Sequence, residues 1–254
     1  MTGPAETQAA RPHFFGRRKG KALRPGRARL MADFLPLVAV PPPGDPALAE
    51  PAGLFGRPVS RLWLEIGFGG GEHLAGQAAA NPDVGIIGCE AFVNGVARLL
   101  AHIAGTPAAD TVRVHSGDAR LLLPCLPDAC LDRVFLLFPD PWPKPRHAKR
   151  RFTCPENLAV LARLMKDGAE LRVASDDMTY IRFTLEMATR HPDFAWTAEG
   201  PDDWLTRPAD WIPTRYEEKA LRAGRVPIVL SFVRRPRAGA CGGGPAVAPP
   251  SRKT

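Results

Sequence analysis

The chain has 254 residues, 45% of them hydrophobic, which is enough for one domain with a substantial core. Lys and Arg total 34 against 26 for Asp and Glu, so the formal charge is +8 and the candidate partners are polyanions such as nucleic acid or an anionic membrane. No apolar stretch is long enough to span a bilayer, and the N-terminus lacks the apolar run of a secretory signal. We therefore expect a cytoplasmic protein with no membrane partner.

Composition divides the chain into three regions. Residues 1–33 are rich in Arg, Lys, Gly and Pro, and we expect a flexible basic arm. Residues 34–235 form the main domain, and residues 236–254 form a Gly-, Pro- and Ala-rich tail that we expect to be disordered. The five cysteines show no CxxC spacing, which favours reduced thiols and predicts no metal site.

Short apolar strands alternate with helical patterns through the main domain. Strands are expected at residues 61–66, 84–90, 111–115, 132–138, 169–174 and 227–233. Helices are expected at residues 72–80, 91–104, 155–165 and 178–189. This alternation predicts an α/β fold in which helices cover both faces of a parallel sheet. In such folds ligands bind beyond the carboxyl ends of the strands.

The first strand runs into a glycine-rich turn, Glu65-Ile66-Gly67-Phe68-Gly69-Gly70-Gly71. Glycines permit a tight turn and a close approach of the backbone to a ligand. The spacing is GxGxG rather than the GxGxxG of a dinucleotide site, and Glu65 would repel a pyrophosphate. A carboxylate there suits a cationic ligand, and S-adenosyl-L-methionine carries a sulfonium and an ammonium but no phosphate.

Two further acids follow the next two predicted strands. Glu90 comes about twenty residues after the glycines, where an acid can accept hydrogen bonds from both ribose hydroxyls. Asp118 follows the third strand and could accept a hydrogen bond from the adenine amino group. Three acids at three successive strand ends favour a site for the cationic cofactor.

The fourth strand leads into Pro139-Asp140-Pro141-Trp142-Pro143-Lys144. The flanking prolines restrict the backbone around Asp140, which predicts a rigid loop at the edge where the ligand would bind. The next six residues, Arg146-His147-Ala148-Lys149-Arg150-Arg151, include five basic or titratable side chains. Because this run adjoins the predicted active site, phosphate binding is favoured over a merely solvated surface.

Together the segments LEIGFGGGEHL, FPDPWPK, RHAKRR, Ala174-Ser175-Asp176-Asp177 and Thr214-Arg215-Tyr216-Glu217 resemble the bacterial tRNA (guanine-N7-)-methyltransferases. The resemblance extends from about residue 14 to about residue 233. It implies a Rossmann-like class I methyltransferase fold, with a mostly parallel seven-stranded sheet, helices on both faces and one antiparallel strand near the C-terminus. It also implies transfer of a methyl group from S-adenosyl-L-methionine to N7 of guanosine at position 46, in the tRNA variable loop.

The same resemblance implies roles for individual residues. Asp140 would be catalytic. The cofactor-binding residues would be Glu65, Gly67, Gly69, Glu90, Asp118 and Asp140. The substrate-binding residues would be Lys144, Asp176, Thr214, Arg215, Tyr216 and Glu217. The RNA-contacting residues would be Arg146, His147, Lys149, Arg150 and Arg151. The N-terminal FGRRKGKALRPGR is also similar to some members of the family, which favours contact of the arm with RNA.

Two other functions remain open on the sequence. A class I methyltransferase could act on another RNA position or on a small molecule, and a non-enzymatic module could simply bind RNA. The glycine turn and the acids argue against the second, because binding alone would not need them. We expect tRNA as the partner, no obligatory protein partner, and either a monomer or a homodimer.

Overall fold

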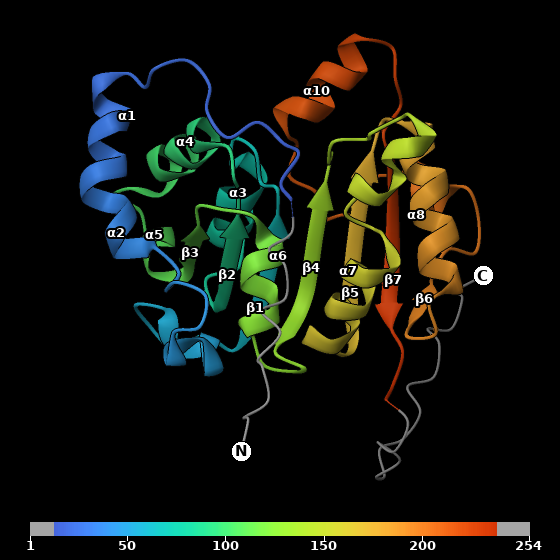
Figure 1. The fold of residues 1–254 in the computed structure, drawn as a ribbon, viewed down its shortest axis with the longest axis horizontal. Helices are drawn as coiled ribbons and strands as arrows, with labels where there is room; N and C mark the ends of the chain where they lie inside the picture. The colour runs from blue at the N-terminus through green and yellow to red at the C-terminus, as the bar shows by residue number, and fades with distance from the viewer. Residues whose placement is uncertain (1–12, 238–254) are drawn as a thin grey trace, which may run out of the picture.

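The computed structural model describes residues 13–237, and residues 1–12 and 238–254 lie outside that description. Seven strands form one sheet in the order β3-β2-β1-β4-β5-β7-β6 (Figure 1). Strand β7 pairs antiparallel with both β5 and β6, whereas the other neighbouring pairs are parallel. The strands are β1 (Arg61–Ile66), β2 (Val84–Cys89), β3 (Val112–His115), β4 (Leu131–Leu137), β5 (Met165–Ser175), β6 (Phe194–Trp196) and β7 (Ile228–Arg234). The expected mostly parallel sheet, with an antiparallel strand near the C-terminus, is confirmed.

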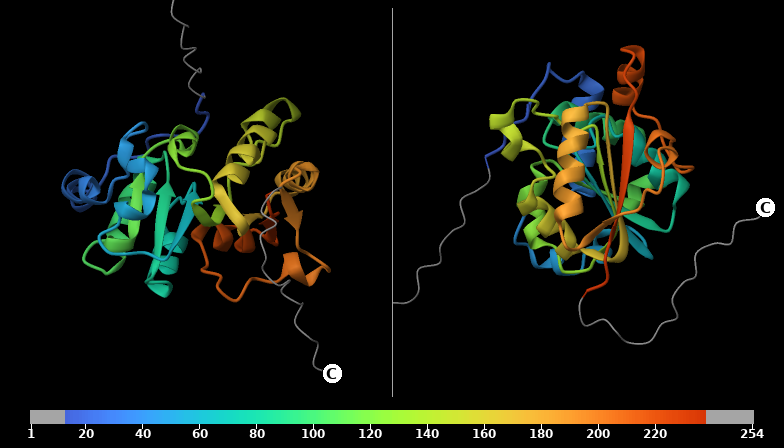
Figure 2. Two further views of the ribbon diagram at one scale, coloured as in Figure 1. Left: turned by 90° about the horizontal axis from the view of Figure 1, so that it is seen from below. Right: turned by 90° about the vertical axis from the view of Figure 1, so that its right-hand side faces the viewer.

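Helices cover both faces of this sheet (Figure 2). The α-helices are α1 (Pro25–Arg29), α2 (Leu35–Val38), α3 (Glu72–Ala80), α4 (Val93–Ile103), α5 (Ala108–Thr111), α6 (Ala119–Leu122), α7 (Pro155–Leu164), α8 (Met178–Arg190), α9 (Asp202–Leu205) and α10 (Arg215–Arg222). A π-helical turn, Leu30–Phe34, joins α1 to α2, and a 3-10 segment, Pro145–Arg150, precedes α7. No helix within residues 13–237 is both long and apolar enough to cross a membrane.

Side chains that alternate between the two faces of the sheet divide the core into two layers. Leu62 and Leu64 of β1 belong to the cluster that packs under α6, α7 and α8. Trp63, with Phe135 of β4, belongs to the cluster under α3 and α4. Successive side chains of a strand point to opposite faces, so each strand contributes to both layers. Residues 65, 133, 135 and 172, at alternate positions on neighbouring strands, therefore share the face covered by α3.

Parallel pairing brings several strand ends to one edge of the sheet. Ile66 of β1 lies opposite Cys89 of β2 and opposite Leu136 of β4. The glycine turn, Glu90 and the loop after β4 consequently begin side by side. Strand order reverses between β1 and β4, which is where open α/β sheets bind ligands.

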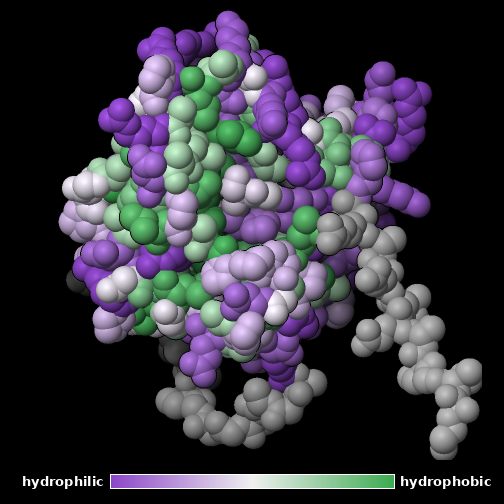
Figure 3. All heavy atoms as spheres, turned by 60° about the vertical axis from the view of Figure 1, so that its left-hand side comes forward, coloured by the Kyte–Doolittle hydropathy of each residue, from purple (hydrophilic) through white to green (hydrophobic). Residues whose placement is uncertain are grey.

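Part of the N-terminal region predicted as a basic arm is helical in the structure. Helix α1 begins at Pro25, and the boundary predicted at residue 33 falls inside a helical region. Leu30, Met31, Phe34 and Leu35 recur at helical spacing and pack against the cluster under α4. Hydrophobic patches lie between hydrophilic groups on the face brought forward in Figure 3. The division of the chain into arm, domain and tail stays a prediction, and most of the tail lies outside the described residues.

Candidate active site

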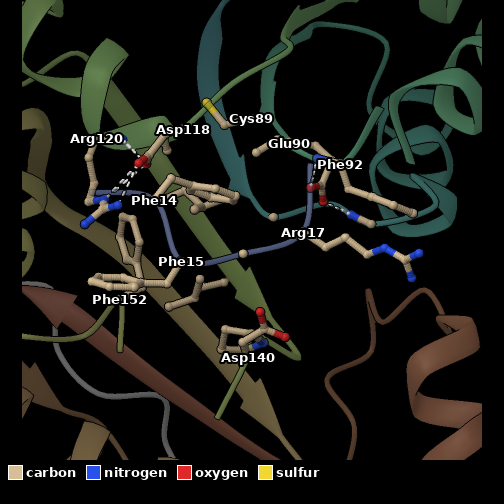
Figure 4. A pocket seen from close by; sticks show the side chains of 18 of the residues that line it. Phe14, Phe15, Arg17, Cys89, Glu90, Phe92, Asp118, Arg120, Asp140 and Phe152 are labelled. Carbon is tan, nitrogen blue, oxygen red and sulfur yellow. Dashed lines mark hydrogen bonds and ion pairs between the residues drawn. The ribbon is translucent and has the colours of Figure 1, made fainter. Parts of the chain in front are cut away.

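A pocket of about 440 Å³ opens at the strand ends around the reversal of strand order. Its lining comes from β1, β2, β4, the segments after β2, β3 and β4, the N-terminal segment and α10. In Figure 4 the predicted acids Glu90, Asp118 and Asp140 lie around this pocket. The other predicted residues that line it are Gly67, Gly69, Arg150 and Tyr216. The structure therefore brings residues that are distant in the sequence into one site.

The glycine turn adopts a backbone that other residues rarely take. Gly67, Gly69 and Gly71 have φ values of 71°, 57° and 80°. These left-handed angles are accessible to glycine without a steric penalty, and they turn the chain from β1 into α3 within five residues. Gly71 is also the residue that precedes α3, and a Cβ there would come within 2.7 Å of the Leu99 side chain.

Helix α4 approaches this turn through Gly95. A Cβ on Gly95 would lie 2.2 Å from the Gly69 carbonyl oxygen and 3.2 Å from Cγ of Glu90. We expect Gly95→Ala to push α4 and the turn apart, lowering the free energy of unfolding by about 1–3 kcal/mol and distorting the pocket. Denaturant unfolding and calorimetric titration with S-adenosyl-L-methionine measure both effects. Gly53→Ala, where a Cβ meets open space, is the matched control, and equal behaviour of the two variants would contradict the close approach.

Glu90 is fixed at the start of α4 by two backbone groups. Its Oε2 accepts a hydrogen bond of 2.8 Å from the Gly69 amide, and its Oε1 accepts one of 2.8 Å from the Phe92 amide. Burial raises the pKa of Glu90, while these hydrogen bonds act in the opposite direction. The carboxylate thus connects the end of β2 to the glycine turn and faces the pocket from between them.

Asp118 caps α6 and is paired with Arg120. Its Oδ1 accepts a hydrogen bond from the Arg120 amide at 3.1 Å, and its Oδ2 lies 2.7 Å from Nη2 of Arg120. The same nitrogen donates to the carbonyl oxygen of His13 at 2.9 Å. Asp118 is 6% exposed and lines the pocket, so it is placed to accept a ligand's amino group while its charge is largely compensated.

Asp140 is exposed at the pocket and lies between two residues with unusual backbones. Phe138 and Trp142 have φ values of 51° and 43°, in the left-handed region that large side chains rarely occupy. The Phe138 amide donates a 2.7 Å hydrogen bond to the Ala174 carbonyl of β5. Each such residue costs about 1–3 kcal/mol and persists where its surroundings hold it, often at functional sites. The rigid loop predicted from the prolines is therefore also held in a strained shape.

Arg151 holds this loop, and the contact with RNA predicted for it stays a prediction. Its side chain is 5% exposed, and its guanidinium donates to the carbonyls of Pro141 at 3.0 Å and Trp142 at 2.9 Å. It also packs on the Phe183 ring. In this structure the guanidinium is therefore engaged within the protein. The sequence predicted the same RNA-contacting role for all five residues of the run. It could not distinguish Arg151, because the burial of each side chain depends on tertiary packing.

The remaining basic residues form a rim beside the pocket. Lys144, Arg146 and Lys149 are exposed on or next to the 3-10 segment. The Arg150 guanidinium lies 4.2 Å from the centre of the Phe15 ring and 4.9 Å from that of Trp142.

His147 lies on the same segment. Its pKa is lowered, first by desolvation and then by the positive charges of Arg150, Arg146 and Lys144, so it is neutral at neutral pH. The positive charge of this rim therefore comes from lysine and arginine.

The predicted substrate segment forms the start of α10. Thr214 caps the helix by accepting a hydrogen bond from the Glu217 amide, and Tyr216 reaches the pocket. Glu217 is 1% exposed and accepts a hydrogen bond from the Trp211 indole, and its predicted contact with substrate stays a prediction. Arg215 lies over the Tyr216 ring. Of this set, only Tyr216 lines the pocket.

Asp176 and Glu65 do not line the pocket. Asp176, between the end of β5 and the start of α8, accepts a 2.6 Å hydrogen bond from Arg225. Glu65 is 3% exposed, and its carboxylate lies 2.7 Å from Nδ1 of His73 in α3. The alternation of β1 turns the Glu65 side chain toward α3, and the direct contact with a cofactor predicted from its place before the glycines stays a prediction.

The N-terminal segment forms part of the site, which the sequence analysis did not assign to the pocket. Phe14, Phe15 and Arg17 line the pocket, and Figure 4 shows their segment crossing it. The Arg18 carbonyl accepts a hydrogen bond from the Val93 amide at the start of α4. The pair of aromatic residues preceding the basic run was the signal available in the sequence. Cys89 also lines the pocket, and burial raises the pKa of its thiol, which keeps it protonated.

Known proteins similar to this chain are methyltransferases. A family model described as "Putative methyltransferase" matches residues 60–230. A tRNA (guanine-N(7)-)-methyltransferase of Rhodospirillum rubrum is 58% identical over 227 residues, covering 89% of this chain and 89% of that protein. The protein of the same name from Paramagnetospirillum magneticum is 52% identical and covers 90% of this chain and 95% of its own length. The crystal structure of the 16S rRNA methyltransferase KamB is 16% identical, with a TM-score of 0.49 over 70% of this chain and 89% of that one.

The sheet order, the pocket at the strand ends and the matching family model define a methyltransferase with the Rossmann-like class I fold. The chain belongs to the tRNA (guanine-N(7)-)-methyltransferase family. The family expected from the sequence motifs is thereby confirmed.

Proposed function

We propose that this protein transfers the methyl group of S-adenosyl-L-methionine to N7 of a guanosine in the variable loop of tRNA. One observation carries the proposal: Glu90, Asp118 and Asp140 from three separate strand ends line one pocket together with Arg150, whose 3-10 segment also carries the exposed cations Arg146 and Lys149 and follows the exposed Lys144. Acids suit a cationic nucleoside, and the adjoining cations suit a polyanion. The names of the relatives agree with this chemistry.

The residues present fit the cofactor by the chemistry of their side chains. Glu90 would accept hydrogen bonds from the two ribose hydroxyls, and Asp118 would accept one from the adenine amino group. The glycine turn leaves room for close approach because Gly67 and Gly69 have no side chain. When bound, the cofactor supplies a methyl group on a sulfonium, which is already a strong electrophile.

Guanine N7 is unprotonated at neutral pH, so the chain needs no general base to begin the transfer. Its residues have to orient the base and exclude water, and positioning of this kind supplies roughly 7–11 kcal/mol. Asp140 would accept hydrogen bonds from the guanine N1–H and 2-amino groups, a pattern that adenine does not present. Its negative charge also favours the positive charge that develops on the base. The base must leave its stack to reach this loop.

Incubation with labelled S-adenosyl-L-methionine and an unmodified tRNA transcript tests this function. We expect one labelled guanosine in the variable loop, at a site that borohydride and aniline then cleave. A transcript made with 7-deazaguanosine lacks N7 and should take up no label, and a transcript with adenosine at the variable-loop position should also remain unlabelled.

Other outcomes point to other functions. Label in another nucleoside would identify a different RNA position and contradict the assignment to N7. Cofactor binding without any RNA labelling would favour a small-molecule substrate. A protein whose melting temperature does not respond to S-adenosyl-L-methionine would be an RNA-binding module instead.

A further inference from the structure

A row of buried polar residues lies on the α3 side of the sheet, outside the pocket. Glu65 contacts Nδ1 of His73, and Nε2 of His73 lies 3.3 Å from Nε2 of Gln77. The Nε2 of the Gln77 side chain then donates a 2.7 Å hydrogen bond to the backbone carbonyl of Asp210. The first three side chains are at most 3% exposed. This row begins directly beneath the glycine turn and ends in the segment that precedes α10.

The Asp210 carboxylate is held by arginines from two neighbouring strands. Its Oδ1 lies 2.8 Å from Nη1 of Arg172 in β5, and its Oδ2 lies 2.6 Å from Nη1 of Arg133 in β4. Both arginines also contact Glu170, at 3.0 Å and 2.9 Å. Two arginines packed on a sheet are costly unless they are paired, so Asp210 completes their charge balance. Burial alone would raise the pKa of Asp210, but the hydrogen bonds and charges of the two arginines lower it.

The residues around Asp210 fix the position of α10. The Trp211 indole donates to Glu217 at 2.8 Å, and Nε of Arg207 lies 2.5 Å from the same carboxylate. Ile212 packs against α3 so closely that a Cβ on Gly76 would come within 2.8 Å of it. The segment between α9 and α10 is therefore fastened both to the sheet and to α3.

Helix α10 in turn forms a wall of the pocket through Tyr216. A Cβ on Gly69 would lie 2.8 Å from Cε2 of Tyr216, so the phenol ring rests on the glycine turn. The glycine turn and the Tyr216 ring meet in the pocket. Outside the pocket, Asp210 connects α3, which follows the turn, to the segment that precedes α10. Nothing in the proposed chemistry uses Asp210, Gln77 or the two arginines directly.

We propose that Asp210 is a positioning residue that holds Tyr216 against the glycine turn, with Gln77, Arg133 and Arg172 as its anchors. Its carboxylate fixes the segment to the sheet, and its carbonyl fixes the segment to α3. The inference deepens the proposed function and rests on it. It names Asp210 as the residue that keeps Tyr216, on the predicted tRNA-binding side, aligned with the glycine turn on the predicted cofactor side. Neither Asp210 nor Gln77 touches the pocket.

Asp210→Asn tests this role, because it keeps the size of the side chain and removes the charge that the arginines share. We expect faster hydrogen exchange in residues 206–222, with β1 and β4 unchanged. We expect kcat for tRNA methylation to fall about tenfold to a hundredfold, as small misplacements do. The cofactor dissociation constant without tRNA should change less than about threefold, because its principal contacts remain. Asp202→Asn, an exposed aspartate of α9, is the matched control and should behave as wild type.

Gln77→Met provides an independent variant that keeps the volume and helix propensity of Gln77 but removes the bond to the Asp210 carbonyl. It should reproduce the local increase in exchange and part of the loss in kcat. In a protein that already carries Tyr216→Ala, adding Asp210→Asn should lower kcat by less than about twofold, because no ring remains to be positioned. Wild-type kcat in both single variants would overturn the proposal. So would exchange that rises throughout the sheet, or losses that multiply in the double variant.

Failure of the proposed function can be distinguished from failure of this inference. If the wild-type protein does not methylate tRNA, the chemistry is wrong. Hydrogen exchange and cofactor binding, both measured without tRNA, still report whether Asp210 holds the segment. If methylation occurs but exchange in residues 206–222 is unaffected by either variant, the positioning role of Asp210 is wrong.

Discussion

Asp140→Ala is expected to lower kcat for tRNA methylation by about a thousandfold while the protein still binds S-adenosyl-L-methionine. The loop places this carboxylate at the pocket, between the strained residues Phe138 and Trp142, before any substrate arrives. A preorganised charge at the point where charge develops contributes on the order of a hundredfold to a thousandfold. Loss of the hydrogen bonds that select guanine adds to this effect.

Single-turnover kinetics with saturating cofactor measure the loss in the Asp140 variant, and calorimetry measures its cofactor affinity. Asp33→Ala, at an exposed aspartate of the N-terminal helical region, controls for the loss of one negative charge. Turnover by Asp140→Ala within about threefold of wild type would remove Asp140 from the mechanism.

Glu90→Gln is expected to weaken binding of S-adenosyl-L-methionine by about tenfold to a hundredfold, because an amide has one oxygen in place of two and its hydrogen bonds are no longer made to a charged acceptor. The wild-type affinity should also depend on pH. Burial raises the pKa of Glu90 in the free protein, and a bound cation would favour the ionised form and lower it again. Binding therefore releases protons. The affinity falls as the pH drops through the pKa of Glu90 in the free protein, which lies above the ordinary glutamate value of about 4.3.

Calorimetric titrations from neutral pH downward, in buffers of different ionisation enthalpy, measure both the affinity and the released protons. Glu72→Gln, in the first turn of α3 and outside the pocket lining, is the matched control and should keep the wild-type pH dependence. An affinity that stays constant on acidification, or equal effects of the two substitutions, would contradict the role of Glu90.

The sequence predicted those parts of the fold that depend on local patterns. Strand β1 and helix α3 have the bounds expected from their apolar periodicity and the glycines between them. The acids at the ends of β2 and β3 and in the loop after β4 meet in one pocket because parallel strands place their carboxyl ends at one edge. The tight turn expected from the glycine cluster is present, with positive φ at Gly67, Gly69 and Gly71.

The rest of the site depends on contacts between distant segments. Arg151 looks like its basic neighbours in sequence, but its guanidinium is buried and donates to the Trp142 carbonyl in the loop after β4. Glu65 precedes the glycines, yet alternation along β1 directs it to His73. Phe14 and Phe15 reach the pocket only because the chain after them is fastened to α4. None of these outcomes follows from spacing alone.

A crystal structure with S-adenosylhomocysteine tests the central claim most directly, because that product has the same nucleoside and amino-acid groups. Both ribose hydroxyls are expected within hydrogen-bond distance of the Glu90 carboxylate, with the adenine amino group at Asp118. A nucleoside bound away from this pocket, or bound in it with the ribose distant from Glu90, would contradict the account.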